Sequence, residues 1–374
     1  MTGTSCDALD VAVLRFAPAA AGGAWELLAH GSAPLRGGDS GLGARLAAAG
    51  EGSARNAFEL SFEYSGFVAT AVRAFLAAEE LEGQVDLVVS HGQTIGHAPA
   101  AGWTAQIGDG GALAARLGLP VLWNLRSADI ALGGQGAPLV PAADRLLFSR
   151  RLDAVALLNI GGVANVTALP PAERGAAPEA EDAGPGNCLL DHWCRQAAGV
   201  NFDEGGMLAL AGSVDEARAV ALADACRPSA LGESLDYRPP RREALIAAHV
   251  DGLSAADGCA TLALVTARLA AEAVLRACGR AGLVGDAAPR ELLVAGGGAR
   301  NAAMLRYLQE EMGERWTVRA LGRGAGARHG IPPDAREAAC FAALGWLWLH
   351  GKPGAVQEVT GASREAMLGS LALP

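Results

Sequence analysis

The sequence LNIGGVANVT, residues 158–167, places a glycine pair between two apolar runs. The run AVALLNI at 154–160 has the composition of a buried strand, and the run at 163–169 follows as its partner after Gly161 and Gly162. Two glycines at such a junction predict a tight turn between antiparallel strands. Because glycine has no side chain, a ligand can also approach this backbone closely. The stretch therefore predicts a strand, a candidate binding turn and a second strand.

A similar arrangement opens the chain, where MTGTSCDALD at 1–10 leads into an apolar run. The two starts form a weak internal repeat and indicate two related units. Exposed amides and hydroxyls in the first turn can surround phosphate oxygens, and the following carboxylates can orient a hydrated metal. The candidate phosphate-binding residues are Gly3, Thr4 and Ser5, and the carboxylates are Asp7 and Asp10. An ordinary hairpin turn is the competing interpretation.

LLVAGGGARN at 292–301 provides a third glycine-rich turn. Gly296, Gly297 and Gly298 follow a predicted strand and precede a predicted helix, whose N-terminal amides suit an adenosine or a phosphate. The single lysine, Lys352, lies in a turn near the C-terminus, which excludes a Walker A motif and a protein-kinase phosphate clamp. Three glycine turns without a lysine predict a nucleotide held between two lobes by backbone amides, arginine or a metal.

Asp182 in DAGPGN, residues 182–187, is the predicted catalytic carboxylate. The Gly-Pro-Gly turn before a helix can hold this side chain toward a cleft while Asn187 caps the helix. Glu181 and Asp191 are neighbouring competitors. A role at the helix start is the structural alternative for Asp182.

Polar side chains that a core does not require follow the predicted strands of the first half. In open α/β sheets, ligands bind beyond the carboxyl ends of the strands. An arginine beside uncharged hydrogen-bonding groups suits a sugar that carries a carboxylate. The candidate substrate-binding residues are His91, Gln93, Thr94, Gln106, Arg126, Asp129 and Gln135.

The succession of predicted elements favours an α/β fold in which helices flank parallel strands. The predicted helices are 44–80, 112–117, 255–279 and 334–350, and the predicted strands include 85–90, 120–124 and 291–295. At roughly 150 residues per domain, the 374 residues predict two domains. We expect an N-terminal lobe over 1–140 and a C-terminal lobe over 141–374, with the last helix packing back on the first lobe.

The composition, 51% hydrophobic and 19% charged, excludes a disordered chain. The net charge of -10 disfavours nucleic acid and anionic membranes as partners. No apolar run approaches the length of a membrane span and no leader pattern opens the sequence, so we expect a cytoplasmic protein. Seven scattered cysteines without a C-x-x-C pair predict reduced, structural thiols, and His91 and His97 lack a third ligand for zinc.

Taken in order, these motifs resemble those of the anhydro-N-acetylmuramic acid kinases, a branch of the sugar-kinase, Hsp70 and actin superfamily. The matching segments extend over nearly the whole chain: GTS-x-D-x-x-D at 3–10, SHGQT at 90–94, QIGDG at 106–110, R-x-x-D with GGQGAPLVP at 126–141, NIGG-x-ANVT at 159–167, D-x-GPGN at 182–187, GGGARN at 296–301 and PDA-x-EA at 333–338. The resemblance implies a two-lobed, actin-like (RNase H-like) ATPase fold, with duplicated mixed sheets flanked by helices and a central nucleotide cleft.

The resemblance also implies an activity, namely an ATP- and Mg²⁺-dependent hydrolytic kinase of peptidoglycan recycling. Such an enzyme converts 1,6-anhydro-N-acetylmuramic acid and water to N-acetylmuramic acid 6-phosphate. By this likeness Asp182 activates water for attack at C1, and the freed O6 takes the γ-phosphoryl group. A homodimer is implied by the same likeness.

The resemblance assigns further roles to the candidate residues. The first turn and the Gly161–Gly162 turn would cradle phosphates, with Asp7 helping to place Mg²⁺, while Gly296–Gly298 would face the adenosine. Arg126 would meet the lactyl carboxylate of the sugar. Glu337 would line the same cleft in a role that the motif does not specify.

Some segments depart from the family pattern. Ala8 and Ala183 stand where the family has a glycine and a threonine, and the segments 202–206 and 239–243 are altered. These changes motivate two alternatives, a related kinase for a different sugar and an ATP-binding module without efficient transfer. The family also has several strand residues before the first turn. The likeness therefore predicts a missing or very short first strand, with an upstream start codon as the hypothesis.

Overall fold

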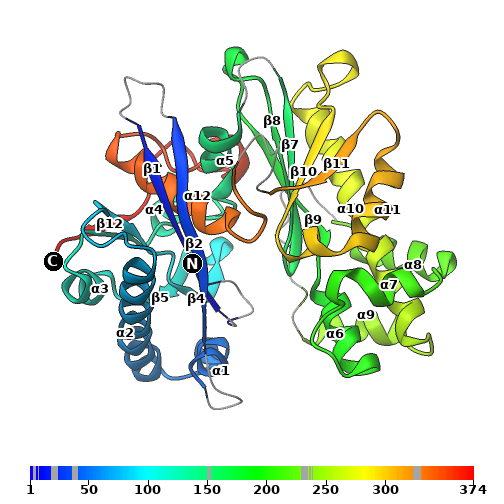
Figure 1. Cartoon of the computed structure of the whole chain (residues 1–374), viewed down its shortest axis with the longest axis horizontal. Helices are drawn as coiled ribbons and strands as arrows, with labels where there is room; N and C mark the ends of the chain where they lie inside the picture. The colour runs from blue at the N-terminus through cyan, green and yellow to red at the C-terminus, as the bar shows by residue number, and fades with distance from the viewer. Residues whose placement is uncertain are drawn as a thin grey trace. The chain divides into compact units, whose positions relative to one another are not determined.

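The computed structural model describes residues 1–2, 6, 8–17, 24–35, 41–149, 153–228, 235, 237, 239–322 and 330–374. The chain divides into two compact units (Figure 1). Unit 1 comprises Met1–Leu147 together with Ala335–Pro374, and unit 2 comprises Phe148–Asp334. The expected lobes, 1–140 and 141–374, place the first boundary seven residues earlier, and the segment 335–374 belongs to unit 1.

Unit 2 is built on a five-stranded mixed sheet with the order β11-β10-β7-β8-β9. Its strands are β7 (Val155–Ile160), β8 (Val163–Leu169), β9 (Glu179–Pro185), β10 (Glu291–Ala295) and β11 (Thr317–Ala320). β11, β10 and β7 run parallel, whereas β7, β8 and β9 form an antiparallel meander. The central β7 is apolar along its length because both of its faces are buried. The predicted glycine turn joins β7 to β8, as expected from the sequence.

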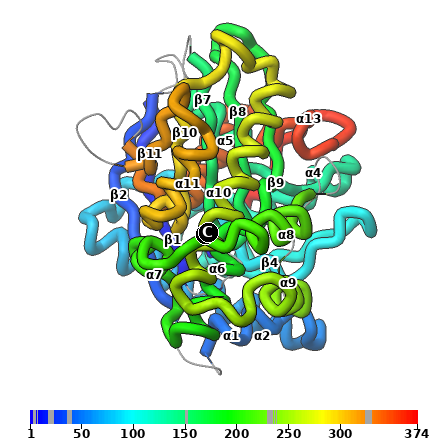
Figure 2. Tube along the Cα trace, turned by 90° about the vertical axis from the view of Figure 1, so that its right-hand side faces the viewer, coloured from blue at the N-terminus to red at the C-terminus, as the bar shows by residue number. Residues whose placement is uncertain are grey.

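Helices cover this sheet, and the longest of them forms the centre of the unit 2 core. They are α6 (Cys188–Trp193), α7 (Met207–Ala211), α8 (Glu216–Cys226), α9 (Arg241–His249), α10 (Ala255–Arg280) and α11 (Ala302–Met312). α10 begins at Ser254, whose hydroxyl accepts a hydrogen bond from the Asp257 amide at 3.1 Å, and it packs on β8 and β9 (Figure 2). Among the described residues α10 is the one helix long and apolar enough to cross a membrane, but 83% of that window is buried. Such burial is typical of a core helix.

The described residues of unit 1 form three separate small sheets. Its strands are β1 (Ala8–Phe16), β2 (Trp25–Pro34), β3 (Val88–Val89), β4 (Gln93–Ala98), β5 (Trp103–Ile107), β6 (Val121–Trp123) and β12 (Ser370–Ala372). β1 and β2 pair antiparallel, β4 and β5 form a hairpin, and β3 pairs parallel to β6, whose other edge pairs antiparallel with β12. The parallel β3–β6 pair confirms the expected strand–helix–strand crossover.

The helices of unit 1 come from both ends of its sequence. They are α1 (Leu42–Ala47), α2 (Ala54–Ala78), α3 (Gly110–Leu117), α4 (Ser127–Ala131), α5 (Val140–Phe148), α12 (Arg336–Leu349) and α13 (Gln357–Thr360). α12 packs against β1 and β3. Its first residue, Arg336, forms a fully buried ion pair with Asp144 of α5, and the Cys340 thiol lies 3.6 Å from the same carboxylate. This ion pair joins the two sequence segments of unit 1.

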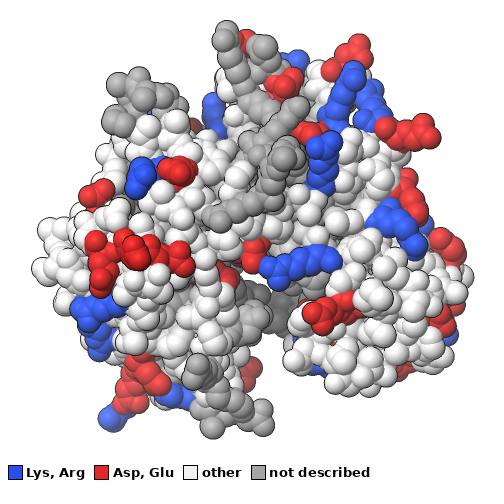
Figure 3. All heavy atoms as spheres, viewed as in Figure 1, with Lys and Arg blue, Asp and Glu red and all other residues white. Residues whose placement is uncertain are grey.

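The surface seen in Figure 3 carries charges of both signs. On this face, among the described residues, Lys and Arg side chains are dispersed among Asp and Glu side chains, with no broad basic area. Exposed ion pairs such as Arg45–Glu63 at 2.7 Å contribute to this pattern.

Candidate active site

In unit 2, the glycine turn between β7 and β8 packs directly against the segment that follows β9. The Asn187 amide donates to the Gly161 carbonyl at 2.7 Å, and the Gly186 amide donates to the Gly162 carbonyl at 3.0 Å. The Asn187 side chain also donates to the Ile160 carbonyl at 3.1 Å. A Cβ atom at position 186 would lie 2.2 Å from the Gly161 carbonyl oxygen, so this contact requires glycine.

The third glycine segment closes on the same turn. Gly296 has φ 79°, and a Cβ there would lie 2.6 Å from the Ile160 carbonyl oxygen. A Cβ on Gly298 would lie 2.3 Å from the Ile160 side chain. By contrast, a Cβ on Gly162 would meet no atom within 4 Å, so the tip of the β7–β8 turn is open. The structure thus brings Gly161, Gly162 and Gly296–Gly298 together as a backbone cradle with an open tip.

Asp182 lies on β9, opposite Asn165 of β8, on the strand that leads into this cradle. It lies three positions before Pro185, which at strand spacing places it about 10 Å from Pro185 along the strand. Its side chain is half-buried, and one carboxylate oxygen accepts the Leu235 amide at 3.0 Å. Burial raises the pKa of Asp182 to about 6, and the nearby Glu181 charge adds to the rise. The carboxylate is therefore ionised at neutral pH yet basic enough to accept a proton.

Glu181, the competing carboxylate, serves a different purpose. It is buried and pairs with Arg276 at 3.1 Å and Arg280 at 3.0 Å, both on α10. Alternation along β9 separates the ion-paired Glu181 from its neighbour Asp182. Two arginines held by one carboxylate fix β9 against α10, which leaves Asp182 as the candidate base.

Two polar residues with structural roles here were not predicted from the sequence. Asp203 is buried and accepts the Leu208 amide at 2.7 Å and the Ala209 amide at 3.1 Å. Asn301 caps α11 by accepting the Met304 amide at 2.9 Å, and its amide group lies 3.5 Å from Asp203. The sequence does contain a signal for Asp203, because this residue keeps the aspartate of the corresponding family segment and precedes Gly205 and Gly206. Sequence reasoning treated the segment 202–206 only as a departure from the family pattern.

In unit 1, the partly buried Arg126 forms a hydrogen-bonded pair with the buried His91. The His91 Nδ1–H donates to the Gly92 carbonyl at 2.8 Å, so Nε2 accepts from Arg126 Nε at 3.1 Å and from Nη2 at 2.9 Å. Burial and the Arg126 charge hold the pKa of His91 well below its usual value, which keeps the imidazole neutral. Arg126 Nη1 also donates to the Gly136 carbonyl at 2.6 Å.

Arg126 is consequently held by neutral acceptors. Burial lowers its pKa to about 10, and the charges of Glu337 and Asp129 partly oppose this shift. Among the described residues, no carboxylate oxygen lies within the 4.0 Å salt-bridge distance of this guanidinium. A partly buried arginine that retains its charge without such a pair is suited to receive an anionic group.

Asp129 and Gln135 act on the loop beside this pair. Both carboxylate oxygens of the buried Asp129 are engaged, one by the Gly136 amide at 2.7 Å and the other by the Thr360 hydroxyl at 2.7 Å. The Gln135 amide donates to the Thr360 carbonyl at 2.8 Å, and its side chain is exposed. Asp129 therefore positions the loop that carries Gly136, the acceptor for Arg126.

The β4–β5 hairpin brings the remaining polar candidates together. The Gln106 side-chain amide donates to Thr104 at 2.8 Å and to Thr94 at 3.3 Å. Gln93 is buried, and within the described part of the chain its Oε1 has no hydrogen-bond partner. The sequence placed these residues in loops after strands, whereas they lie on the strands themselves because the hairpin alternates polar and apolar positions.

The remaining predicted site residues are Glu337, Asp10 and those of the first turn. Glu337 lies in the first turn of α12, and its side chain is exposed. Asp10 lies on β1, half-buried. The predicted phosphate and metal residues Gly3, Thr4, Ser5 and Asp7 lie outside the described residues. Among the described residues, no group of three or more His, Cys, Asp or Glu side chains is placed to hold a metal ion.

Comparisons with known proteins give a consistent result. The family model for anhydro-N-acetylmuramic acid kinase matches residues 1–374. The protein of that name from Synechococcus sp. (strain CC9605) is 36% identical over 390 residues, covering 99% of this chain and 97% of that protein. The one from Streptomyces coelicolor is 37% identical over 382 residues, covering 99% and 92%. A ROK family glucokinase structure from Streptomyces griseus, with glucose and AMPPNP, has a TM-score of 0.37 at 13% identity, over 85% of this chain and 91% of that one, a likeness too low to carry an argument.

Proposed function

Because the chain belongs to the anhydro-N-acetylmuramic acid kinase family, we propose that it converts 1,6-anhydro-N-acetylmuramic acid, ATP and water to N-acetylmuramic acid 6-phosphate and ADP. The observation that carries the proposal is the convergence of three glycine-rich segments of unit 2 at one open turn, with Asp182 on the strand that leads into it. This geometry supplies backbone amides for phosphate oxygens and a base near them.

The proposed reaction begins at the anhydro bridge of the sugar. Asp182 accepts a proton from water as the water oxygen bonds to C1 and the bond from C1 to O6 breaks. O6 then attacks the γ-phosphorus of ATP, and ADP leaves. The raised pKa of Asp182 supports its role as the base, since a carboxylate of ordinary pKa would hold the proton more weakly.

On the sugar side, the proposal assigns the anionic lactyl group to Arg126. His91, as a neutral acceptor, fixes two of the guanidinium nitrogens, and the Gly136 carbonyl fixes a third. Gln93, Thr94 and Gln106 offer uncharged groups for sugar hydroxyls or the acetamido group. We propose that Glu337 accepts a hydrogen bond from the same sugar.

We also propose that the carboxylates of the first turn help to bind Mg²⁺. Mg²⁺ in phosphoryl-transfer sites typically uses one or two carboxylates, waters and the phosphates of the nucleotide. Asp7 and Asp10 supply hard oxygen donors of this kind, so the residues fit a hydrated ion. When bound, the ion would neutralise charge on the β- and γ-phosphates. A cytoplasmic location and a homodimer complete the proposal, and light scattering tests the dimer.

The decisive experiment measures ADP release by the purified protein with Mg²⁺-ATP, in the presence and absence of 1,6-anhydro-N-acetylmuramic acid. We expect sugar-dependent ADP and a product whose mass has increased by one water and one phosphoryl group. Turnover only with other sugars would replace the proposed substrate. ATP binding without turnover on any sugar of a panel would identify an ATP-binding module instead.

A further inference from the structure

The β4–β5 hairpin of unit 1 contains a histidine, His97, that the sequence did not indicate as a ligand-binding residue. His97 pairs with Thr104 across the hairpin, and Thr94 pairs with Gln106. The register shifts between Thr94 and Gly96, so β4 uses one residue more than β5 between these two pairs. Strict alternation would put positions 94 and 97 on opposite faces of the hairpin, and the extra residue brings them to the same face.

Hydrogen bonds connect these side chains in a row. His97 Nδ1 lies 2.9 Å from the Thr104 hydroxyl oxygen. The same hydroxyl oxygen accepts from Gln106 Nε2 at 2.8 Å, and Nε2 also donates to the Thr94 hydroxyl at 3.3 Å. The direction of the His97–Thr104 hydrogen bond depends on which ring nitrogen carries the proton. We refer to Gln106, Thr104 and His97 as the hairpin relay.

The loop that carries Gly136 decides which nitrogen this is. A Cβ at Gly136 would lie 3.4 Å from His97 Cε1, and a hydrogen bond with the Gln135 backbone favours a protonated ring nitrogen. Since Nδ1 contacts Thr104, the nitrogen that serves the Gln135 carbonyl is Nε2. Partial desolvation and the Arg126 charge lower the pKa of His97, so the ring is neutral at neutral pH. A neutral ring with its proton on Nε2 accepts a hydrogen bond at Nδ1.

This acceptor fixes the direction of the whole relay. The Thr104 hydroxyl has a single proton, and His97 Nδ1 at 2.9 Å is a closer acceptor for it than the Gly96 carbonyl at 3.4 Å. Toward Gln106 the hydroxyl therefore acts as an acceptor. Both hydrogens of the Gln106 amide then point to hydroxyl groups, those of Thr104 and Thr94. The atom that Gln106 can offer to a ligand is consequently its carbonyl oxygen, Oε1.

The imidazole of His97 also links the hairpin to the loop that holds Arg126. The Gly136 carbonyl accepts from Arg126 Nη1 at 2.6 Å, and the Gly136 amide donates to Asp129 at 2.7 Å. Through the Gln135 backbone, His97 contacts this same loop. One side chain thus joins the two parts of unit 1 to which we assign the sugar.

We propose that His97 is a positioning residue that fixes the direction of the hairpin relay, so that Gln106 presents Oε1 to a hydrogen-bond donor of the sugar. The role of Gln106 rests on the proposed function, because the ligand is the anhydro sugar. The uncharged donors of 1,6-anhydro-N-acetylmuramic acid are its acetamido N–H and its C4 hydroxyl. A ligand that offers only an acceptor at this place would leave two oxygens facing each other, which selects against it.

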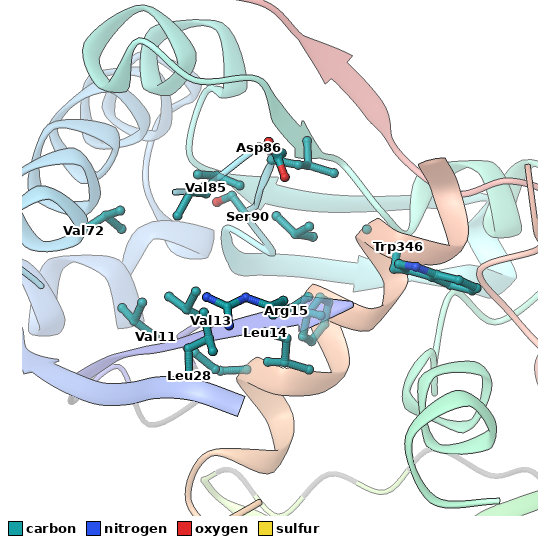
Figure 4. Close-up of a pocket in the computed structure, with 18 of the residues that line it drawn as sticks. Val11, Val13, Leu14, Arg15, Leu28, Val72, Val85, Asp86, Ser90 and Trp346 are labelled. Atoms are coloured by element: carbon teal, nitrogen blue, oxygen red, sulfur yellow. The ribbon is translucent and has the colours of Figure 1, made fainter. Parts of the chain in front are cut away.

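Substitution of His97 leaves the apolar packing of unit 1 in place. The side chain is exposed. A cavity of about 470 Å³ in this unit is lined mainly by apolar residues such as Val11, Val13 and Val72 (Figure 4), and His97 is not among its described lining residues. Surface substitutions of this kind change stability little. An altered sugar affinity in a His97 variant therefore reports on hydrogen bonding.

The first test determines the tautomer of His97 in the ligand-free protein, from the NMR chemical shifts of its ring nitrogens. His97→Asn assigns the signal by its loss. We expect a proton on Nε2 and an unprotonated, hydrogen-bonded Nδ1. His91, whose Nδ1–H donates to the Gly92 carbonyl, should show the opposite tautomer and serves as the internal reference. A proton on Nδ1 of His97 would overturn the proposal, whatever the substrate is.

The second test compares KM for the anhydro sugar in two variants. His97→Asn keeps an acceptor near the position of Nδ1, whereas His97→Phe keeps the ring shape without an acceptor. We expect KM for the sugar to rise about tenfold in His97→Phe and less than about threefold in His97→Asn, with KM for ATP unchanged in both. In a Thr104→Val background, His97→Phe should have no further effect. Equal KM values in the two His97 variants would overturn the proposal.

The third test uses two sugar analogues, one without the C4 hydroxyl and one with a methylated acetamido nitrogen. We expect the wild type to bind one of them at least about tenfold more weakly than the parent sugar, and His97→Phe to lose this preference. Equal affinity of the wild type for all three sugars would overturn the role of Gln106. A wild type without turnover on the anhydro sugar would refute the proposed function and the role of Gln106 with it, while the tautomer measurement still decides that of His97.

Discussion

The two units differ in the groups that they offer to a ligand, which are backbone groups in unit 2 and side chains in unit 1. Unit 2 offers backbone, because the Gly161–Gly162 turn meets Gly296–Gly298, and a Cβ at Gly296 or Gly298 would collide with Ile160. Unit 1 offers side chains, because Arg126 is held by His91 and a carbonyl group while Asp129 fixes the adjoining loop. Backbone amides suit a phosphate common to many substrates, whereas a fixed arginine distinguishes one anion from another. The comparison predicts that substitutions in the two units separate nucleotide affinity from sugar affinity.

The largest expected effect comes from Asp182, the one side chain in unit 2 to which we assign chemistry. Asp182→Asn removes the base but keeps an oxygen that can accept the Leu235 amide. We expect turnover to fall about 10³-fold, with ATP affinity within a few-fold of the wild-type value. Steady-state kinetics and nucleotide titration measure the two quantities. Near-normal turnover would refute the assignment of the base and remove the chemical role of unit 2.

The second effect concerns the stability of unit 1. Asp144→Asn leaves the buried Arg336 without its charged partner, and we expect a loss of about 3 kcal/mol in the free energy of unfolding. Denaturant titration measures this loss. Arg45→Gln, which breaks an exposed ion pair in the same unit, is the control and should cost less than about 1 kcal/mol. Equal costs would show that the buried pair does not hold the two segments together.

A third substitution tests the anion specificity of unit 1. Arg126→Lys keeps the positive charge but cannot engage His91 through two nitrogens at once. We expect KM for the anhydro sugar to rise about 30-fold while KM for ATP changes less than about threefold. Kinetics with each substrate varied in turn make the measurement. A parallel rise in both KM values would contradict the separation between the units.

Smaller effects are expected from two glycine substitutions in unit 2, one at a packed position of the cradle and one at its open tip. Gly298→Ala places a methyl 2.3 Å from the Ile160 side chain, so it should lower stability by about 1–3 kcal/mol. Gly162→Ala meets no protein atom within 4 Å, so it should leave Tm unchanged and raise KM for ATP several-fold. Gly279→Ala on α10, equally unobstructed, should change neither activity nor KM. An unchanged KM in Gly162→Ala would place the phosphates elsewhere.

A final effect is the pH dependence that Asp182 imposes. Its folded pKa of about 6 lies above the unfolded value of 3.8, so the folded state binds the extra proton between these two values. Below about pH 6 we expect kcat/KM to fall about tenfold per unit, while this group makes folding more favourable. In Asp182→Asn the Tm should exceed that of the wild type at pH 8, and this difference should shrink between pH 6 and 4. A flat activity profile down to pH 4 would exclude a base of this pKa.

Sequence reasoning predicted the mixed α/β architecture because the apolar runs and glycine turns are local signals. The β7–β8 turn is where LNIGGVANVT indicated it, and the family membership confirms the resemblance drawn from the ordered motifs. The site residues stay predictions as far as ligand contact is concerned. The structure adds the contacts between these residues, such as the hydrogen bonds from Arg126 to His91.

Other features depend on contacts between distant residues and could not be read from the sequence. Nothing near Asp144 indicates that Arg336, 192 residues later, would complete its ion pair. The Leu235 amide on Asp182 and the buried Asp203 at the α7 start likewise arise from tertiary packing.

The return of the chain to unit 1 sets an order of events during synthesis. Residues 148–334 must be translated after Asp144 and before Arg336 emerges, which takes roughly 10–40 s at 5–20 residues per second. Unit 2 is continuous in sequence and can fold as it leaves the ribosome, whereas the first 147 residues wait without Arg336 beside Asp144 and without α12 against β1. A nascent chain that has emerged from the ribosome only as far as residue 334 would therefore hold a completed second unit and an unfinished first one.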